Sequence, residues 1–226
     1  MKNLIYLLLL SMAITSCKKE EARQVNQYTI EQFYTNTRFE GGTFSADETR
    51  LLVGSDETGI FNLYEITLAD GAKKQLTTST VESYYPVDYV PGMSALIYSA
   101  DKGGNEIDHL YLLEDNGKTT DLTPGENNKV SFFKWSEDKK SMFYISNIRD
   151  PKYFDVYKMN IGEWIPTLFY ENKSGLDVNE ISDDEKTLVV SKTVTTSENE
   201  LYLVNRETDT QTELSLPDQK GRYGVS

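Results

Sequence analysis

The chain has 226 residues, 38% of them hydrophobic, which is enough for one or two domains with a buried core. Its 15 tyrosines and 9 phenylalanines against 5 methionines favour strands over helical bundles. The formal net charge of −13 argues against a nucleic-acid partner, and a single Cys and a single His exclude an internal disulfide and any site that needs two imidazoles.

The N-terminal segment has the features of a processed export signal. Lys2 supplies a positive charge, and the apolar run 4–15 is too short to span a bilayer, which needs roughly 20 residues. The run ends in ITSC at residues 14–17, which resembles the lipobox of bacterial lipoproteins. We therefore expect a signal peptide over residues 1–16 and a lipid anchor on Cys17. An ordinary secretory signal with an incidental Cys is the alternative.

A charged and polar stretch, KKEEARQVNQ, follows the Cys and contains few large apolar residues. We expect residues 17–27 to be a tether. The run Lys18–Glu21 also resembles the export tags of some surface lipoproteins, although a solvated linker explains it equally well. Together with the anchor, these features predict a protein held at the periplasmic face or the outer surface of a bacterial envelope.

A turn pattern then recurs along the rest of the chain. FSADETRLLVGS at residues 44–55 has the same layout as WSEDKKSMFYIS at residues 135–146, and weaker copies lie at 89–100 and 181–192. Their turn residues are Asp47, Gly92, Asp138 and Asp184, at steps of 45, 46 and 46. In the second copy, Pro91-Gly92 replaces the Asp as a turn signal. A constant period of this length indicates a repeat architecture.

Each repeat contains four short strand segments. An apolar run follows the turn, with runs at 51–53, 96–98, 142–145 and 188–190, and successive apolar residues indicate strands buried on both faces. An apolar–Tyr pair comes next, then a hairpin turn such as Asp70-Gly71 or Asn116-Gly117, then a last strand. This pattern predicts an all-β fold, a β-propeller with four four-stranded blades near 38–77, 84–123, 130–168 and 176–215 within residues 28–226. We expect these blades to form part of a larger ring.

The Phe/Trp-Ser-x-Asp turns and the stretches SADKGGNEIDHLY at 99–111 and SNIRDPKYFDVY at 146–157 resemble the TolB-like propellers of prolyl oligopeptidase-family serine peptidases. The subgroup that the sequence resembles is that of secreted bacterial dipeptidyl or acylaminoacyl peptidases, and the resemblance covers about residues 28–215. It implies a propeller that precedes an α/β-hydrolase domain and admits oligopeptides to its active site. Periplasmic TolB shares the turn pattern.

The catalytic features of such a peptidase are missing from this sequence. A nucleophile elbow has the pattern Gly-x-Ser-x-Gly, with an Asp and a His later in the chain. Only Ser94 and Ser226 have Gly two residues before them; Ser94 is followed by Ala95-Leu96, and Ser226 is the last residue. The single His109 lies within a repeat. We therefore expect a chain truncated before the hydrolase domain, with no catalytic residues and no cofactor of its own.

Several residues remain as candidates for particular roles. Asp47, Asp138 and Asp184 are predicted to cap backbone amides of their own turns. His109 takes the strand position of Asn62 and Asp155, which favours a hydrogen-bonding role, and Trp135 and Trp164 are expected in the core rather than stacked on a ligand. The loop 101–108 lacks the acidic spacing of a calcium site and is interpreted as a polar hairpin loop. Arg149 and Asp150 are the candidate substrate-facing pair.

Two functions are therefore expected from the sequence. The first is the non-catalytic, substrate-gating propeller of a secreted serine peptidase that cleaves oligopeptides, with the chemistry in a domain outside this chain. The alternative is a stand-alone, TolB-like lipoprotein propeller that binds a protein or peptide in the cell envelope.

Overall fold

The computed structural model describes residues 25–216 and 219–225, and it divides the chain into two units, 1–36 and 37–226. The described part of the first unit contains one short helix, α2 (Ile30–Tyr34). Thr29 caps this helix: its hydroxyl accepts the amide of Gln32, and the Gln32 side chain accepts the amide of Thr29. The repeat pattern did not predict this helix. The only sequence signal for so short an element is the Thr-x-x-Gln spacing of the capping box.

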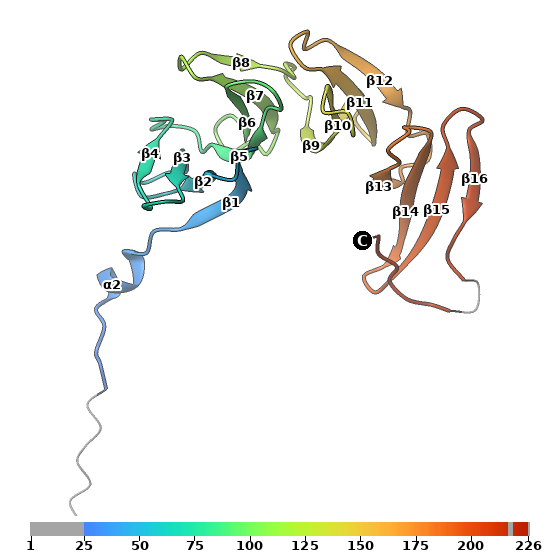
Figure 1. Cartoon of the computed structure of the whole chain (residues 1–226). Helices are drawn as coiled ribbons and strands as arrows, with labels where there is room; N and C mark the ends of the chain where they lie inside the picture. Colours follow the sequence, from blue (N-terminus) through green and yellow to red (C-terminus); the bar gives the residue numbers. More distant parts are fainter. Residues whose placement is uncertain (1–24, 217–218, 226) are drawn as a thin grey trace, which may run out of the picture. The chain divides into compact units, whose positions relative to one another are not determined.

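The second unit consists of four antiparallel sheets that follow one another in chain order (Figure 1). Each sheet is a four-stranded meander, so the predicted propeller with four blades is confirmed. We call the sheets blades 1 to 4. Their strands are β1–β4 (Phe39–Phe44, Arg50–Ser55, Asn62–Thr67, Lys73–Gln75), β5–β8 (Tyr85–Tyr89, Ala95–Ala100, His109–Glu114, Thr119–Asp121), β9–β12 (Val130–Trp135, Ser141–Asp150, Tyr153–Asn160, Pro166–Tyr170) and β13–β16 (Asp177–Ile181, Thr187–Thr195, Glu198–Asn205, Thr210–Glu213).

The repeated turn joins the first two strands of every blade. In blade 1 the amide of Ser45 donates to the carbonyl of Arg50 at 2.9 Å, and the amide of Val90 donates to the carbonyl of Ala95 at the same distance in blade 2. Gly92 has a φ of 72°, a left-handed conformation that Gly adopts without strain. Pro91-Gly92 therefore closes the same turn without the Asp.

Neighbouring blades are joined by three apolar clusters. One holds Leu52 and Leu63 of blade 1 against Leu96 and Tyr98 of blade 2. The second joins blades 2 and 3, and the third joins blades 3 and 4. Trp135 is buried in the second cluster and Trp164 packs against it, as predicted for core residues. Because successive residues of a strand point to opposite faces, each middle blade serves two clusters at once.

The second strand of each blade shows this arrangement directly. In blade 2 the run 96–98 is fully buried, and the run 142–144 of blade 3 is buried as well. Leu51 of blade 1 and Val189 of blade 4 are only half-buried, since they point away from the neighbouring blade. The burial predicted on both faces is therefore complete for the run of blade 2, whereas Ile145, the last residue of the predicted run 142–145 in blade 3, is half-buried.

The first strands of the blades are also linked by polar contacts. Asp88 on β5 accepts a hydrogen bond from the Thr43 hydroxyl of β1 at 2.7 Å and from the Trp135 indole of β9 at 2.8 Å. Lys134 on β9 donates to Glu180 on β13 at 2.6 Å. One carboxylate thus ties three blades together, and an ion pair extends the chain of contacts to the fourth.

A close backbone approach fixes the first pair of blades. A Cβ atom at Gly41 would lie 2.7 Å from Cγ of Pro86, and Gly41 has a φ of 70°. A side chain there would force β1 and β5 apart, so this position requires glycine.

Among the described residues, no helix is long and apolar enough to cross a membrane.

Candidate functional site

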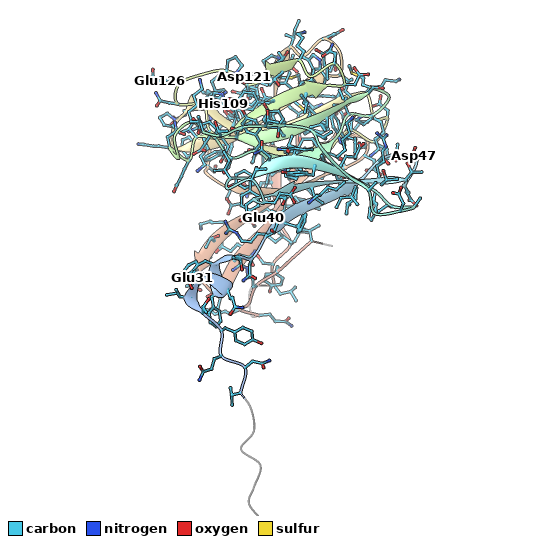
Figure 2. The ribbon with its side chains drawn as sticks, turned by 90° about the vertical axis from the view of Figure 1, so that its left-hand side faces the viewer. Glu31, Glu40, Asp47, His109, Asp121 and Glu126 are labelled. Atoms are coloured by element: carbon cyan, nitrogen blue, oxygen red, sulfur yellow. The ribbon has the colours of Figure 1, made fainter. Side chains whose placement is uncertain are left out.

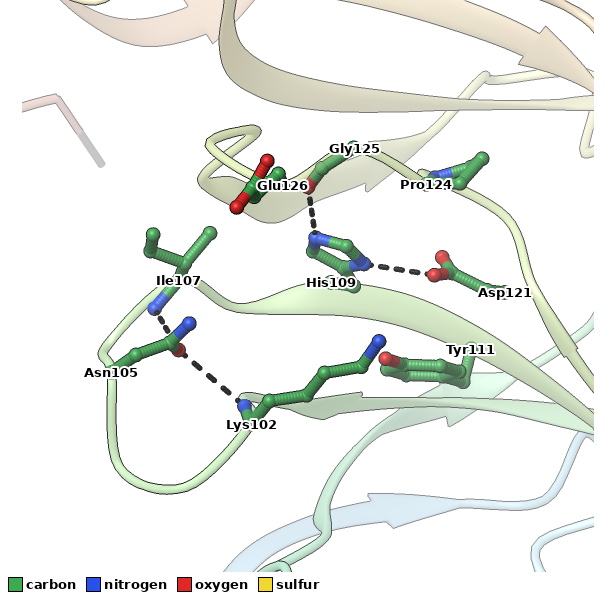
Figure 3. A pocket seen from close by; sticks show the side chains of 9 residues that line it. All are labelled: Lys102, Asn105, Ile107, His109, Tyr111, Asp121, Pro124, Gly125 and Glu126. Atoms are coloured by element: carbon green, nitrogen blue, oxygen red, sulfur yellow. Dashed lines mark hydrogen bonds and ion pairs between the residues drawn. The ribbon is translucent and has the colours of Figure 1, made fainter.

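The residues with unusual surroundings gather at one end of blade 2. In a four-stranded meander, the hairpin loop between the second and third strands lies at the same end as the segment that leaves the last strand. Here these are the loop 101–108 and the connector 122–129. They border a hollow of about 350 Å³ (Figure 3). Its lining residues are Lys102, Asn105, Ile107, His109, Tyr111, Asp121, Pro124, Gly125 and Glu126.

His109 lies in this hollow and is only 8% exposed. Its Nδ1 is 2.8 Å from the Asp121 carboxylate and its Nε2 is 2.9 Å from the carbonyl oxygen of Gly125. Because a carbonyl oxygen can only accept, Nε2 donates, and both ring nitrogens are occupied. Among the described residues, no serine lines the hollow. The imidazole is therefore a structural link and is not placed to serve as the base of a serine nucleophile.

The same strand position performs the same task in two other blades. The Asn62 carbonyl oxygen accepts the amide of Ser79 at 2.7 Å, and its amide group donates to the Ser79 carbonyl at 3.0 Å. Asp155 accepts the amide of Asn172 at 2.7 Å. Each of these buried polar side chains holds the connector to the next blade. The hydrogen-bonding role predicted for His109 from its alignment with Asn62 and Asp155 is what the structure shows.

The candidate substrate-facing pair occupies a different place from the one expected. Arg149 and Asp150 are the last residues of strand β10 rather than part of a loop. The Arg149 guanidinium makes two hydrogen bonds to the buried Asp155, from Nε at 2.6 Å and from Nη2 at 2.9 Å. These bonds and the nearby charge of Asp155 raise the pKa of Arg149 above its ordinary value. Asp150 accepts the amide of Lys152, so both residues are engaged within blade 3.

The three repeated aspartates lie in separate turns and do not form a common site. The Asp47 carboxylate accepts hydrogen bonds from the Ser45 hydroxyl at 2.6 Å and from the amide and hydroxyl of Thr49. Asp138 and Asp184 make the corresponding contacts with a Ser hydroxyl and a backbone amide, without a counterpart of the Thr49 hydroxyl. Figure 2 shows Asp47 at the opposite end of the sheets from His109, Asp121 and Glu126. Cys17, the expected lipid anchor, lies outside the described residues.

The loop 101–108 uses its own polar groups to fix its shape. Asp101 accepts the amide of Glu106 at 2.8 Å, and the Asn105 side chain accepts the amides of Lys102 and Ile107. Among the residues that the structure describes, no group of three or more His, Cys, Asp or Glu side chains is arranged to hold a metal ion.

Sequence reasoning did not assign a role to Lys102, Tyr111, Asp121 or Glu126 in a common site. The signal that could have grouped them is the order of the strands, which brings the two segments to the same end of the blade. The repeat alignment placed the loop 101–108 and the segment after the blade's last strand, but the two were not recognised as neighbours at one end of the blade. What the arrangement offers is binding chemistry: an ammonium, carboxylates and a phenol around apolar walls.

Comparisons with known proteins agree with this architecture. TolB from Acinetobacter baumannii superposes with a TM-score of 0.56 at 14% identity, over 81% of this chain and 45% of that one. A prolyl endopeptidase structure gives 0.59 at 16% identity, over 84% and 30%. A puromycin-hydrolyzing peptidase from Mycobacterium tuberculosis gives 0.56 at 17% identity, over 80% and 32%. This chain thus spans less than half the length of each of these three.

The similarity to these three structures shows that the chain has the β-propeller fold. A comparison with curated protein sequences finds no match. The sequence profile of the prolyl oligopeptidase N-terminal β-propeller domain matches residues 87–226, which is more than half of the chain. The chain therefore belongs to the family of prolyl oligopeptidase N-terminal β-propeller domains.

Proposed function

We propose that this chain is the substrate-gating, non-catalytic propeller portion of a secreted serine peptidase that cleaves oligopeptides. The observation that supports this function best is the family match over residues 87–226 in a sequence without a Gly-x-Ser-x-Gly elbow. Its one histidine is committed to Asp121 and Gly125. Nucleophile, base and oxyanion hole would be supplied by a hydrolase domain outside these residues.

The packing of the blades supports a gating role. Apolar clusters and the Asp88 contacts hold the first strands of neighbouring blades against one another. Interiors packed in this way resist deformation. In the proposed role, this rigid propeller admits short extended peptides to the catalytic domain and excludes folded proteins. The propeller would restrict which substrates reach the catalytic domain, without taking part in bond cleavage.

The second candidate is a stand-alone envelope lipoprotein that binds a protein or peptide. The similarity to TolB and the ITSC sequence at residues 14–17 favour it. In both cases we propose a lipid anchor at Cys17 that holds the protein at a bacterial membrane. The coding sequence downstream of Ser226 separates the two candidates: an in-frame Gly-x-Ser-x-Gly supports the peptidase, and a stop codon without one supports the lipoprotein.

The gating role is tested on the product of the longer reading frame. Cleavage of a short reporter peptide and of the same sequence in an exposed loop of a folded protein is compared between the intact product and a form that lacks residues 28–215. We expect the intact form to cleave only the short peptide and the shortened form to lose this preference. Equal preference in two folded, active forms would refute gating by the propeller.

A further inference from the structure

The hollow of blade 2 has the size and the walls of a small-ligand site. Its volume of about 350 Å³ lies within the range of pockets that hold small molecules. Ile107, Pro124 and the ring of Tyr111 supply apolar surface around it (Figure 3). Mostly apolar walls with a few polar groups are the usual composition of such sites.

The floor and the rim of the hollow are held in place by the protein itself. His109 joins Asp121 on β8 to Gly125 on the connector, and Asn128 donates to the carbonyl of Thr123 at 3.0 Å. Gly125 has a φ of 150°, and a Cβ there would lie 2.9 Å from that of Asn128. A site fixed in this way loses little conformational entropy when a ligand binds.

Two opposite charges border the hollow without neutralising each other. Neither the Lys102 ammonium nor the Glu126 carboxylate has an ion-pair partner within 4.0 Å among the described residues. In the view of Figure 3 they lie on opposite sides of the His109 ring. Glu114 and Lys118 of the same blade, in contrast, form an ion pair at 3.2 Å. The Tyr111 side chain also lines the hollow and makes no hydrogen bond within the described part of the chain.

We propose that this hollow binds a short peptide with both termini free. Its terminal carboxylate pairs with Lys102 and Tyr111, its terminal ammonium pairs with Glu126, and its side chains contact Ile107 and Pro124. A simple anion or cation would compensate only one of the two charges, whereas a di- or tripeptide brings both at a separation that exceeds an ion-pair contact. This inference rests on the proposed function, since it names the part of the propeller that retains small peptides.

The experiment uses His109 as a reporter, because it is the only histidine in the chain. Its imidazole resonances are followed by NMR while Ala-Ala, N-acetyl-Ala-Ala and Ala-Ala amide are titrated into the purified protein. We expect the free dipeptide to shift these resonances, and each blocking group to weaken binding by about tenfold or more, as the loss of one charge-assisted contact implies.

Two variants assign the contacts. Glu126→Gln should remove the effect of N-acetylation, and Lys102→Gln should remove the effect of amidation. Lys118→Gln, which changes a lysine of the same blade outside the hollow, should bind like the unmodified chain.

The inference is overturned if free and blocked dipeptides bind equally, if none of them binds, or if Lys118→Gln weakens binding as much as Lys102→Gln does. A failure here leaves gating intact when the longer product still selects short peptides. Conversely, charge-dependent dipeptide binding in a protein whose longer product shows no selection would retain the site and refute gating.

Discussion

The repeated aspartates explain how a short sequence pattern can define a blade. In each of three turns a Ser hydroxyl donates to the carboxylate, and a backbone amide two residues further on donates to the same carboxylate. These hydrogen bonds favour the charged form, so the pKa of Asp47 falls from 3.8 to about 2, and the pKa values of Asp138 and Asp184 are lowered as well. A side chain that caps its own turn needs no partner from elsewhere in the fold.

These lowered pKa values predict a specific acid sensitivity. A carboxyl group whose pKa is depressed by folding stabilises the protein above its unfolded value of 3.8, and this contribution is lost as the pH falls toward about 2. We expect the variant D47N/D138N/D184N to be less stable at neutral pH and to lose less further stability across that window. Urea unfolding at several pH values measures both effects. Asp183→Asn is the control, and an unchanged slope in the triple variant would contradict the assignment.

His109 shows that different residues at one strand position can each form hydrogen bonds to the connector that leads to the next blade. Asn62, His109 and Asp155 all bind the connector that follows their blade. His109→Ala would leave the Gly125 carbonyl and the Asp121 carboxylate without this partner, and we expect a loss of about 1–3 kcal/mol in the free energy of unfolding.

The matched variant is His109→Asn, because Asn performs this task in blade 1. It should retain most of the stability that His109→Ala loses, as measured by denaturant unfolding. An equal loss in the two variants would mean that His109 acts through its volume rather than through its hydrogen bonds.

At the scale of the elements, the seams between blades differ in chemistry. The seam between blades 2 and 3 relies on the largest apolar cluster and on the bond from Trp135 to Asp88. The seam between blades 3 and 4 carries ion pairs, and in each the lysine comes from the blade 3 side and the acid from blade 4. These pairs are Lys134–Glu180, Lys158–Glu185 and Lys173–Asp209. Such a one-directional arrangement specifies which faces meet.

Lys158 and Glu185 form the least exposed of these pairs, with both carboxylate oxygens within 2.7 Å of the ammonium. Reversing one charge, Lys158→Glu or Glu185→Lys, should lower the free energy of unfolding by about 1 kcal/mol, and the double exchange should restore most of it. The losses should shrink at high salt, because screening weakens repulsion between like charges. Additive losses in the double variant would show that the pair does not couple the blades.

The repeated elements were predictable because their chemistry is local. Ser45 and Asp47, their equivalents and the hairpin glycines specify turns through contacts within a few residues, and the runs between them are apolar. Helix α2 was not predicted, since its only sequence signal is one capping box. Arg149 was expected in a loop and lies at the end of a strand, where it pairs with Asp155 and Glu171. No sequence motif indicates this pairing. The hollow of blade 2 depends on which loops share an end of the sheet, and that emerges only from the folded meander.

For the whole molecule, burial follows the order of the blades. The middle blades are covered on both faces by apolar clusters, while Leu51 and Val189 on the outward faces of blades 1 and 4 are half-buried. Stability of this kind is a sum of blade contributions and nearest-neighbour interfaces, so changes at one seam should affect the adjoining blades most. The chain as a whole is acidic, with a formal net charge of −13.

The proposed anchor predicts a chemical modification of the whole protein. Cys17 is the only cysteine, and it ends the apolar run after Ile14-Thr15-Ser16. In bacterial cells we expect the chain to incorporate labelled palmitate and Cys17→Ser to remain an unlabelled precursor. Equal labelling of the two forms would refute the lipid anchor at Cys17. A cleaved but unlabelled chain would indicate an ordinary secretory signal.

In the proposed function, the chemistry of peptide cleavage resides outside this chain. Serine peptidases of this kind depend on an activated serine, and such a serine reacts with fluorophosphonate probes. The direct measurement is therefore the labelling of the purified chain, folded as judged by its β-type circular dichroism, beside an active serine peptidase. We expect no labelling and no cleavage of dipeptidyl or acylaminoacyl reporters. Stoichiometric labelling that a single Ser→Ala substitution abolishes would contradict it.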